Sequence, residues 1–429
     1  MIKKKRTGIY LTADLILRNP DYVKVLQDKL GLNLVIISYT GEVIPEVAAV
    51  SPFDGTPLSD PCLYSLICKH LDGQPVDTED FDWVRQSVGP SIRLKGDEEE
   101  FRRAIQSVRE AGAEVWICGG SWSESSLMFC PAHEAVNDWY EAVYIYWATR
   151  YGVDGVDISH ARYPKGRVPR GLFTCTCDNC ARTAADMGYD MEEMKGALHA
   201  GLKRLREVNA RLLAEVCRQG IGPFDFLQFL GMQSGVIDWF RFRSELLTRN
   251  LKRFHRAVHA AAGPDTIFGT DTYPASLSMF MGHNHAHWDE FSDFASPLVS
   301  HISAFVVYTL VRWAKFLQEV NAGLSEKDAL RVVYRFVGYD GMGLPDTIAG
   351  YALEEPARLP SILPLKELIL RDLIKARLYL PEEIPSYPII HGEGWPLEAI
   401  REIVTGAEEA GHDGILWQGT GELVDFDLK

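Results

Sequence analysis

Residues 151–164, YGVDGVDISHARYP, begin as a short apolar run and end in polar side chains. The apolar half suits a buried strand of a parallel sheet. The second half holds four groups that prefer water: Asp157, His160, Arg162 and Tyr163. Polar groups directly after a buried strand are explained if the carboxyl ends of several strands meet around a shared pocket. This stretch therefore favours an α/β barrel.

Seven other apolar runs of similar length accompany this one, with amphipathic segments of helical periodicity between them. The eight predicted strands are 7–14, 32–39, 113–122, 153–160, 265–273, 300–308, 387–395 and 412–419. Apolar strands that alternate with helices are typical of a parallel sheet covered by helices. Eight such units in order predict a (β/α)8 barrel, which we expect to form a single domain over residues 1–429.

Three long segments interrupt the regular alternation. Residues 40–97 follow the second strand, and residues 165–235 follow the fourth. Both stand between a strand and a helix, so we expect them on the catalytic face of the barrel. Residues 322–386 lie between the sixth and seventh strands, and we expect a helical insertion on that face or its flank.

Composition and motifs exclude several classes of protein. The net charge of −15 and the pI near 5.3 argue against a nucleic-acid surface. No apolar run reaches the roughly 18–20 residues needed to cross a bilayer, and no cleavable signal is evident. We therefore expect a cytoplasmic protein without membrane contact, and the composition is compatible with a homo-oligomer. Motifs of P-loop, Rossmann and serine hydrolase proteins are missing, so we expect no organic cofactor.

The predicted strand ends carry many aromatic and ionisable side chains. Aromatic rings stack on the C–H faces of sugars, and carboxylates and imidazoles bind hydroxyl groups, so this mixture favours a small carbohydrate substrate. The predicted substrate-binding residues are Asp14, Tyr39, Trp122, His160, Arg162, Tyr163, Tyr273, His301, Tyr308, His391, Trp395 and Trp417. Packing at the rim is the alternative interpretation of the tryptophans.

Cleavage of a glycosidic bond requires two facing carboxyl groups. The predicted catalytic residues are Asp157, Asp271 and Glu393. We expect Asp157 to be the nucleophile or base, kept ionised by Arg162 and His160. Glu393 lies near Trp395, and an apolar neighbour would raise the pKa of Glu393, as a general acid requires. The remaining aspartate is a rival for either role, and each aspartate can instead be a helix cap or turn former.

A cysteine cluster suggests a metal site. Cys175, Cys177 and Cys180 lie within six residues, and a tetrahedral Zn²⁺ site needs one further ligand. Cys130 is the predicted fourth ligand, with His133 as the alternative. Such a closed site would be structural and would pin the loop after the fourth strand. Reduced thiols that pack the insertion are the other interpretation.

The segment MGHNHAHWDEF holds three alternating histidines, His283, His285 and His287. We interpret it as a polar loop at the rim, and a metal site is the alternative. The leading functional hypothesis is a glycoside hydrolase that cleaves a small glycoside or oligosaccharide. A barrel lyase, isomerase or epimerase acting on a sugar derivative, with or without a metal, is the second, and a sugar-binding barrel without catalysis is the third.

Three stretches resemble a known family. FCPAHEAVNDWYEAVYIYWATRYGVDGVDISHARYP (129–164), TCTCDNC (174–180) and GTDTYP (269–274) are similar to the uncharacterised glycoside-hydrolase-like (β/α)8-barrel proteins, which carry C-x-C-x-x-C after the fourth strand. The resemblance implies a hydrolase acting on glycans or glycosides, with an acid of the fourth strand in the site. The family pattern has an aspartate three residues before the arginine, where this chain has Ser159. If the family's acid aligns with position 159 or 160, the assignment of Asp157 as nucleophile fails and His160 takes that position.

Overall fold

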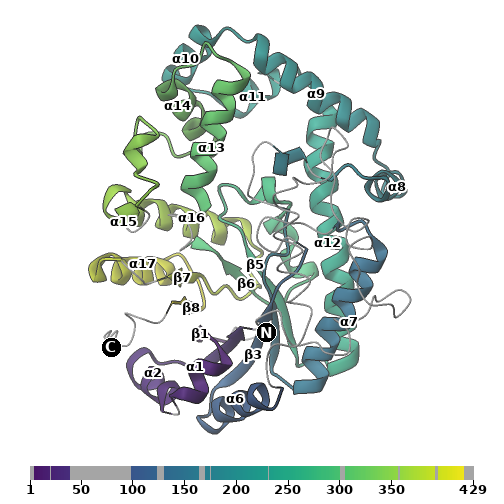
Figure 1. The fold of residues 1–429 in the computed structure, drawn as a ribbon, viewed down its shortest axis with the longest axis vertical. Coiled ribbons are helices and arrows are strands. Elements are labelled where there is room, and N and C mark those ends of the chain that lie inside the picture. Colours follow the sequence, from purple (N-terminus) through teal and green to yellow (C-terminus); the bar gives the residue numbers. More distant parts are fainter. Residues whose placement is uncertain are drawn as a thin grey trace.

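The computed structural model describes residues 4–19, 21–38, 98–122, 130–163, 170–173, 175–229, 231–299, 305–355, 358–391 and 395–419. Eight parallel strands alternate with helices (Figure 1). The strands are β1 (Arg6–Leu11), β2 (Leu34–Ser38), β3 (Glu114–Gly119), β4 (Gly155–Ile158), β5 (Ile267–Thr272), β6 (Ala295–Pro297), β7 (Ile389–His391) and β8 (Gly414–Gln418).

The strands are paired in the order β6-β5-β4-β3-β2-β1-β8-β7. The two ends of this sheet meet before β7. The amide of Ala295 donates to the carbonyl of Pro385 at 2.9 Å, and the amide of Tyr387 donates to the carbonyl of Ala295 at 2.8 Å. These bonds close the ring, which confirms the predicted (β/α)8 barrel.

Helices cover the outside of the barrel. They are α1 (Ala13–Arg18), α2 (Tyr22–Leu30), α6 (Glu98–Glu110), α7 (Glu134–Tyr151), α8 (Asp178–Asp186), α9 (Met191–Glu207), α10 (Ala210–Gln219), α11 (Pro223–Phe229), α12 (Ser234–Ala262), α13 (Phe305–Val320), α14 (Glu326–Val337), α15 (Leu359–Ile362), α16 (Leu365–Tyr379) and α17 (Leu397–Glu409). Gly152 ends α7 in the left-handed conformation, with φ of 57°, and so allows the chain to turn directly into β4. In the part of the chain that the structure describes, no helix has both the length and the apolar character needed to cross a membrane.

The predicted sixth strand, 300–308, is wrong for residues 305–308, and residues 300–304 lie outside the described residues. The strand is Ala295–Pro297, and the apolar run belongs to α13, which begins at Phe305. Two adjacent valines suggested a strand, but the buried positions continue with helical spacing: Val306, Val307, Leu310, Val311 and Ala314. β6 has only three residues, too few to show a periodicity of its own.

Side chains alternate between the barrel interior and the helical layer. Leu34 and Ile36 of β2 pack inside with Trp116, whereas Val35 and Ile37 pack against the helices. Gly155 makes room for the indole, because a Cβ there would lie 2.7 Å from the ring of Trp116. The interior is therefore filled by side chains, as in other small barrels.

An arginine closes the amino end of the barrel. Nε of Arg6 donates to Oε2 of Glu114 at 2.9 Å, and Nη1 donates to the hydroxyl of Tyr387 at 2.8 Å. The guanidinium carbon lies 5.1 Å from the centre of the Trp116 ring, a cation–π contact. The carboxyl ends of the strands are thus the end at which a site can open.

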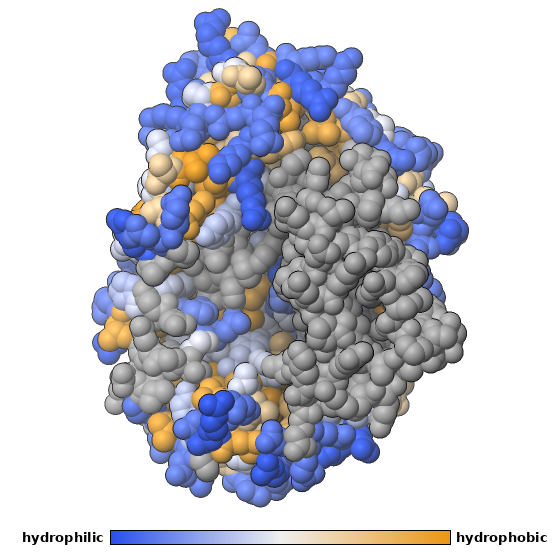
Figure 2. Space-filling model, in the orientation of Figure 1, coloured by the Kyte–Doolittle hydropathy of each residue, from blue (hydrophilic) through white to orange (hydrophobic). Residues whose placement is uncertain are grey.

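The predicted insertions differ in what the structure describes. Residues 40–97 lie outside the described residues. In the described residues of the other two segments, α8 to α11 occupy most of 165–235, and α14 to α16 occupy most of 322–386. An apolar cavity of about 610 Å³ lies among α9, α10, α13 and α14. Figure 2 shows apolar residues gathered over these helices at the top of the molecule. The cavity is lined largely by hydrocarbon and is separate from the strand ends that carry the predicted acids.

Candidate active site

Two buried aspartates face the barrel interior near the carboxyl ends of adjacent strands. Val156 and Ile158 pack in the helical layer, so Asp157 between them points inward. Ile267 packs in the interior, so Asp271, four residues later on β5, points to the same side. Asp157 is 1% exposed and Asp271 is 4% exposed. The structure thus brings together two of the three predicted catalytic residues.

The surroundings of Asp157 raise the pKa of its carboxyl group. Burial raises its pKa to about 7; the hydrogen bonds of Tyr10 and Cys118 oppose the rise, and the charge of Asp271 adds to it. The Tyr10 hydroxyl donates to Oδ2 of Asp157 at 2.7 Å. We expected Arg162 and His160 to keep this carboxyl ionised, and that expectation is wrong. Burial outweighs the groups that favour the charged form, so the protonated form is favoured up to near-neutral pH.

His391 ends β7 at the same opening. Ile389 packs inside the barrel and Ile390 outside, so His391 points inward. The chain passes close to its ring at Gly419, where a Cβ would lie 3.2 Å from the imidazole. Trp395, 7% exposed, packs in the main core after β7. The other predicted residues of this region, Glu393, Tyr39 and His301, lie outside the described residues.

Four predicted substrate contacts pack in the core, pair with other residues or lie on helices. Trp417 points to the helical layer, and Trp122 is fully buried with its Nε1 donating to Oδ1 of Asn137 at 3.0 Å. Asp14 is exposed on α1, where Arg18 pairs with it. Tyr308 lies on α13 and donates to the carbonyl of Leu353 at 3.2 Å. The residue types were suitable, but the phase of alternation along β8 directs Trp417 to the helical layer, and Trp122 packs in the core after β3.

The loop after β4 holds the remaining predicted residues. His160 has φ of 62°, a rare conformation for a residue other than glycine, and such strain gathers at functional sites. Arg162 is 1% exposed, and its guanidinium carbon lies 5.3 Å from the centre of the Tyr273 ring. Its Nε and Nη1 have no hydrogen-bond partner among the residues that the structure describes. Tyr163 is fully buried, and the guanidinium of Arg243 stacks on it at 4.0 Å.

His283 joins the loops that follow β4 and β5. Its Nε2 donates to the carbonyl of Ala161 at 3.0 Å, and its Nδ1 accepts from the amide of Tyr273 at 3.0 Å. Burial lowers its pKa to about 3, so the ring is neutral, as this pattern requires. His285 stacks on Trp288 instead. The structure does not bring the three histidines of this segment together, so the alternative of a metal site there is not supported.

We expect His283→Leu to lower the free energy of unfolding by about 2–4 kcal/mol, because it leaves a buried carbonyl and a buried amide unpaired. Chemical denaturation followed by circular dichroism measures the change. The matched control is His287→Leu, since His287 is exposed and pairs only with Glu290. We expect the control to change stability by less than about 0.5 kcal/mol. Equal effects of the two substitutions would contradict a bridging role.

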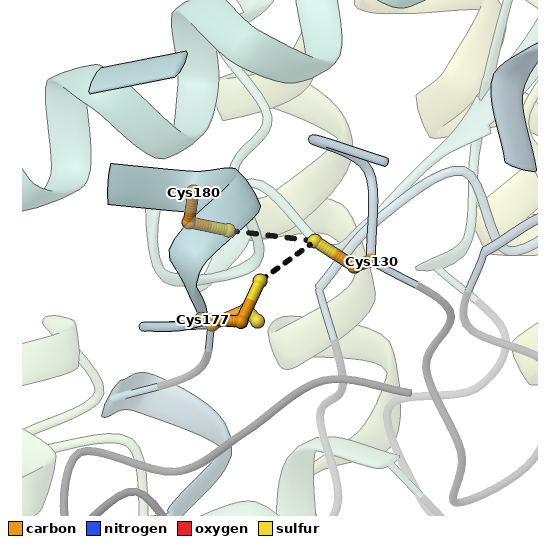
Figure 3. Close-up of side chains that lie close together, drawn as sticks. Cys130, Cys177 and Cys180 are labelled. Atoms are coloured by element: carbon orange, nitrogen blue, oxygen red, sulfur yellow. Dashed lines mark hydrogen bonds between the residues drawn. The ribbon is translucent and has the colours of Figure 1, made fainter. Parts of the chain in front are cut away.

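The four predicted metal-ligating cysteines lie together, and Figure 3 shows how Cys130, Cys177 and Cys180 face one another. Cys130 precedes α7, and Cys175, Cys177 and Cys180 surround the start of α8. The Sγ atom of Cys130 lies 3.5 Å from those of Cys177 and Cys180, and all four sulfurs lie within 4.8 Å of one another. A zinc ion with Zn–S bonds of about 2.3 Å has S···S edges of about 3.8 Å. The buried group therefore fits a tetrahedral metal ion.

The segment that carries Cys130 is itself held in place. The carbonyl of Pro131 accepts hydrogen bonds from Nδ2 of Asn137 at 3.0 Å and from Nδ2 of Asn250 at 2.6 Å. Asn137 also accepts the indole N–H of Trp122. Trp122 therefore helps to position the segment of Cys130 through Asn137, whereas the sequence suggested a contact with substrate.

Sequence reasoning missed Tyr10 and Cys118, which contact Asp157. Both lie inside the barrel, on β1 and β3, and Cys118 is in register with Asp157. Strand alternation could have identified them. Every second side chain of a strand points to the same side, and both residues are an even number of positions from interior residues of their own strands.

The solved structures to which this chain is similar are distant from it in sequence and structure. No family model and no curated protein matches the chain. A β-amylase catalytic domain from Paenibacillus polymyxa covers 97% of this chain and 92% of its own, at 8% identity and TM-score 0.47. A maltogenic α-amylase, AmyB, from Thermotoga neapolitana covers 97% and 67%, at 7% identity and TM-score 0.36. A β-glucosidase covers 95% and 78%, at 8% identity and TM-score 0.37. The chemistry must therefore be argued from the site.

Proposed function

We propose that the protein is a glycoside hydrolase in which Asp157 is the general acid and Asp271 the second carboxylate. The observation that carries the proposal is the buried pair at the carboxyl ends of β4 and β5, in which one member has a pKa of about 7. Two carboxyl groups whose environments separate their pKa values can serve as acid and base in one reaction. The assignment differs from the sequence-based expectation, which gave Asp157 the role of nucleophile or base.

The proposed reaction uses both groups in one step. Asp157 donates its proton to the glycosidic oxygen as the bond from that oxygen to the anomeric carbon breaks. The carboxylate of Asp271 stabilises the positive charge on the sugar, either by bonding to the anomeric carbon or by taking a proton from the water that attacks it. Tyr10 holds Asp157 by its hydrogen bond to Oδ2. We propose that His391 binds sugar hydroxyl groups at the same opening.

Arg162 supports a substrate with an acidic group. Two nitrogens of this buried guanidinium, Nε and Nη1, lack a hydrogen-bond partner among the described residues, which is costly, and a planar carboxylate matches such donors in a bidentate fashion. Arg162 lies beyond the carboxyl end of β4, beside Tyr273 just past β5. A uronic acid is therefore the sugar class that we propose to test first, together with neutral hexosides.

We propose that the cysteine cluster holds a structural Zn²⁺. Four thiolates leave no open position for substrate or water, which is the pattern of structural zinc sites. The ion would fix the loop of Cys130 to the start of α8. The proposed catalytic steps do not involve this group.

The test is a panel of nitrophenyl glycosides and glycuronides with variants of the acids. We expect Asp271→Asn to lower kcat/KM by at least about 1000-fold with an unchanged circular dichroism spectrum. Asp14→Asn is the matched control, because Asp14 is an exposed acid on α1 that pairs with Arg18. Wild-type turnover in Asp271→Asn, or no released sugar from any member of the panel, would contradict the proposal. An unsaturated or epimerised product would support the barrel lyase or epimerase instead.

A further inference from the structure

A second group of metal-binding side chains lies at the amino end of the barrel. His255 and His259 are one turn apart on α12 and face Asp293, which precedes β6. Nε2 of His255 lies 3.1 Å from Oδ1 of Asp293, and Nε2 of His259 lies 3.0 Å from Oδ2. The two imidazole centres are 4.0 Å apart. Three potential ligand atoms therefore converge from two elements.

The aspartate is held rigidly by the neighbouring strand. Its amide donates to the carbonyl of Phe268 at 2.8 Å, and its Oδ2 accepts the amide of Phe268 at 2.8 Å. Phe268 is the second residue of β5. Backbone contacts of this kind orient a carboxylate ligand before an ion binds. The histidines are fixed too, because both lie near the end of a 29-residue helix.

The surroundings suit a cation. The side chains of His255, His259 and Asp293 are 19%, 22% and 27% exposed, so solvent reaches the group. In the described part of the chain no lysine or arginine forms an ion pair with Asp293, and its charge is shared only by the two imidazoles. Histidines at i and i+4 present both Nε2 atoms to one ion, and water can complete the coordination.

We propose that His255, His259 and Asp293 bind a divalent transition metal of the Zn²⁺, Ni²⁺ or Cu²⁺ class. Imidazole nitrogen with a single carboxylate selects these ions over Ca²⁺ and Mg²⁺, which require several oxygen ligands. The site lies at the opposite end of the strands from Asp157 and Asp271 and is separate from the cysteine cluster. Its bound ion would tie α12 to the start of β5 and to the segment before β6, and so stabilise the base of the barrel.

The first experiment counts metal equivalents. Metal-free wild-type protein is titrated with Zn²⁺ by isothermal calorimetry, and bound metal is measured by elemental analysis after desalting. We expect the wild type to bind two equivalents. The double variant, His255→Gln with His259→Gln, should bind one equivalent with wild-type affinity, and its Kd for a second equivalent should be at least 100-fold weaker than in the wild type. His287→Gln is the matched control, because His287 forms an exposed pair with a single carboxylate. It should keep both equivalents.

The second experiment uses the wild type alone and does not depend on how the variant folds. Cobalt(II) is added stepwise, and absorption and X-ray absorption spectra are recorded at each step. Cobalt in the cysteine cluster gives thiolate charge-transfer bands and a sulfur shell near 2.3 Å, whereas the proposed site gives a nitrogen and oxygen shell near 2.1 Å. If no bound equivalent shows a nitrogen and oxygen shell up to 100 μM free metal, or if every bound equivalent has sulfur ligands, the proposal is overturned. A double-glutamine variant that binds both equivalents with wild-type affinity would overturn it as well.

Discussion

Asp157→Asn is expected to abolish turnover and, at the same time, to make the protein more stable above neutral pH. Asparagine keeps the size of the side chain and can still accept the Tyr10 hydrogen bond, but it has no proton to donate to a leaving oxygen. We expect kcat to fall by at least about 1000-fold on substrates with a poor leaving group. On substrates whose leaving group needs no proton, the loss should be much smaller.

The gain in stability follows from the raised pKa. In the folded chain Asp157 keeps its proton up to a pH of about 7, mainly because it is buried, whereas in the unfolded chain it ionises near pH 4. The folded state therefore binds the proton more tightly, and the free energy of unfolding falls as the pH rises from about 4 to about 7. Asparagine does not ionise, so the free energy of unfolding of the variant does not fall for this reason. A difference of about three pH units corresponds to at most about 4 kcal/mol.

Urea denaturation of the wild type and Asp157→Asn at pH 4, 6 and 8 measures this difference. We expect the variant to gain nothing at pH 4 and to gain most of the effect at pH 8. Asp14→Asn controls for the loss of an exposed acid and should not show this pattern. A variant that is equally stable or less stable than the wild type at pH 8 would show that folding does not raise the pKa of Asp157, which would remove the basis for its role as acid.

Removal of the proposed zinc ion is expected to be the most destabilising single change. We expect strong chelation, or Cys177→Ser with Cys180→Ser, to lower the free energy of unfolding by at least about 5 kcal/mol, because structural zinc binding contributes directly to folding. Cys130 and the cysteines of α8 are far apart in the sequence, so the loss of the ion releases two segments from each other. The loop after β4 should become more susceptible to protease.

The matched control is Cys217→Ser. Cys217 is buried in α10 and lies outside the cluster, so its substitution changes a buried thiol without removing a ligand. We expect a loss of about 1–2 kcal/mol. Elemental analysis should find the cysteine-bound zinc in the wild type and in Cys217→Ser, and not in the double serine variant. Unchanged stability after complete removal of zinc would contradict a structural role.

The local part of this architecture was predictable from the chain. Seven of the eight strands were predicted at nearly the right place, because each is a compact apolar run between polar segments. The cysteines at 175, 177 and 180 were found by their spacing, and the distant Cys130 was named because it follows the preceding strand. β6 was not found, since three residues carry no periodicity and a neighbouring helix rich in valine imitated a strand.

The chemical character of the site could not be predicted in the same way. That Asp157 ends an apolar strand is visible in the sequence, but its raised pKa depends on burial and on Tyr10, Cys118 and Asp271, which come from three other strands. The direction of Trp417 depends on the phase of alternation along β8. The pairing of His255 and His259 with Asp293 depends on how the end of α12 meets the start of β5.

The hydrogen-bonded group of Arg6, Glu114 and Tyr387 at the amino end of the barrel affects how substrate enters and product leaves. Side chains fill the barrel interior and this group closes its amino end, so a reaction at Asp157 and Asp271 takes place at the carboxyl ends of the strands, and product leaves from the side on which substrate arrives. A departing molecule then obstructs the next arrival, and turnover should slow as products accumulate, in competition with fresh substrate.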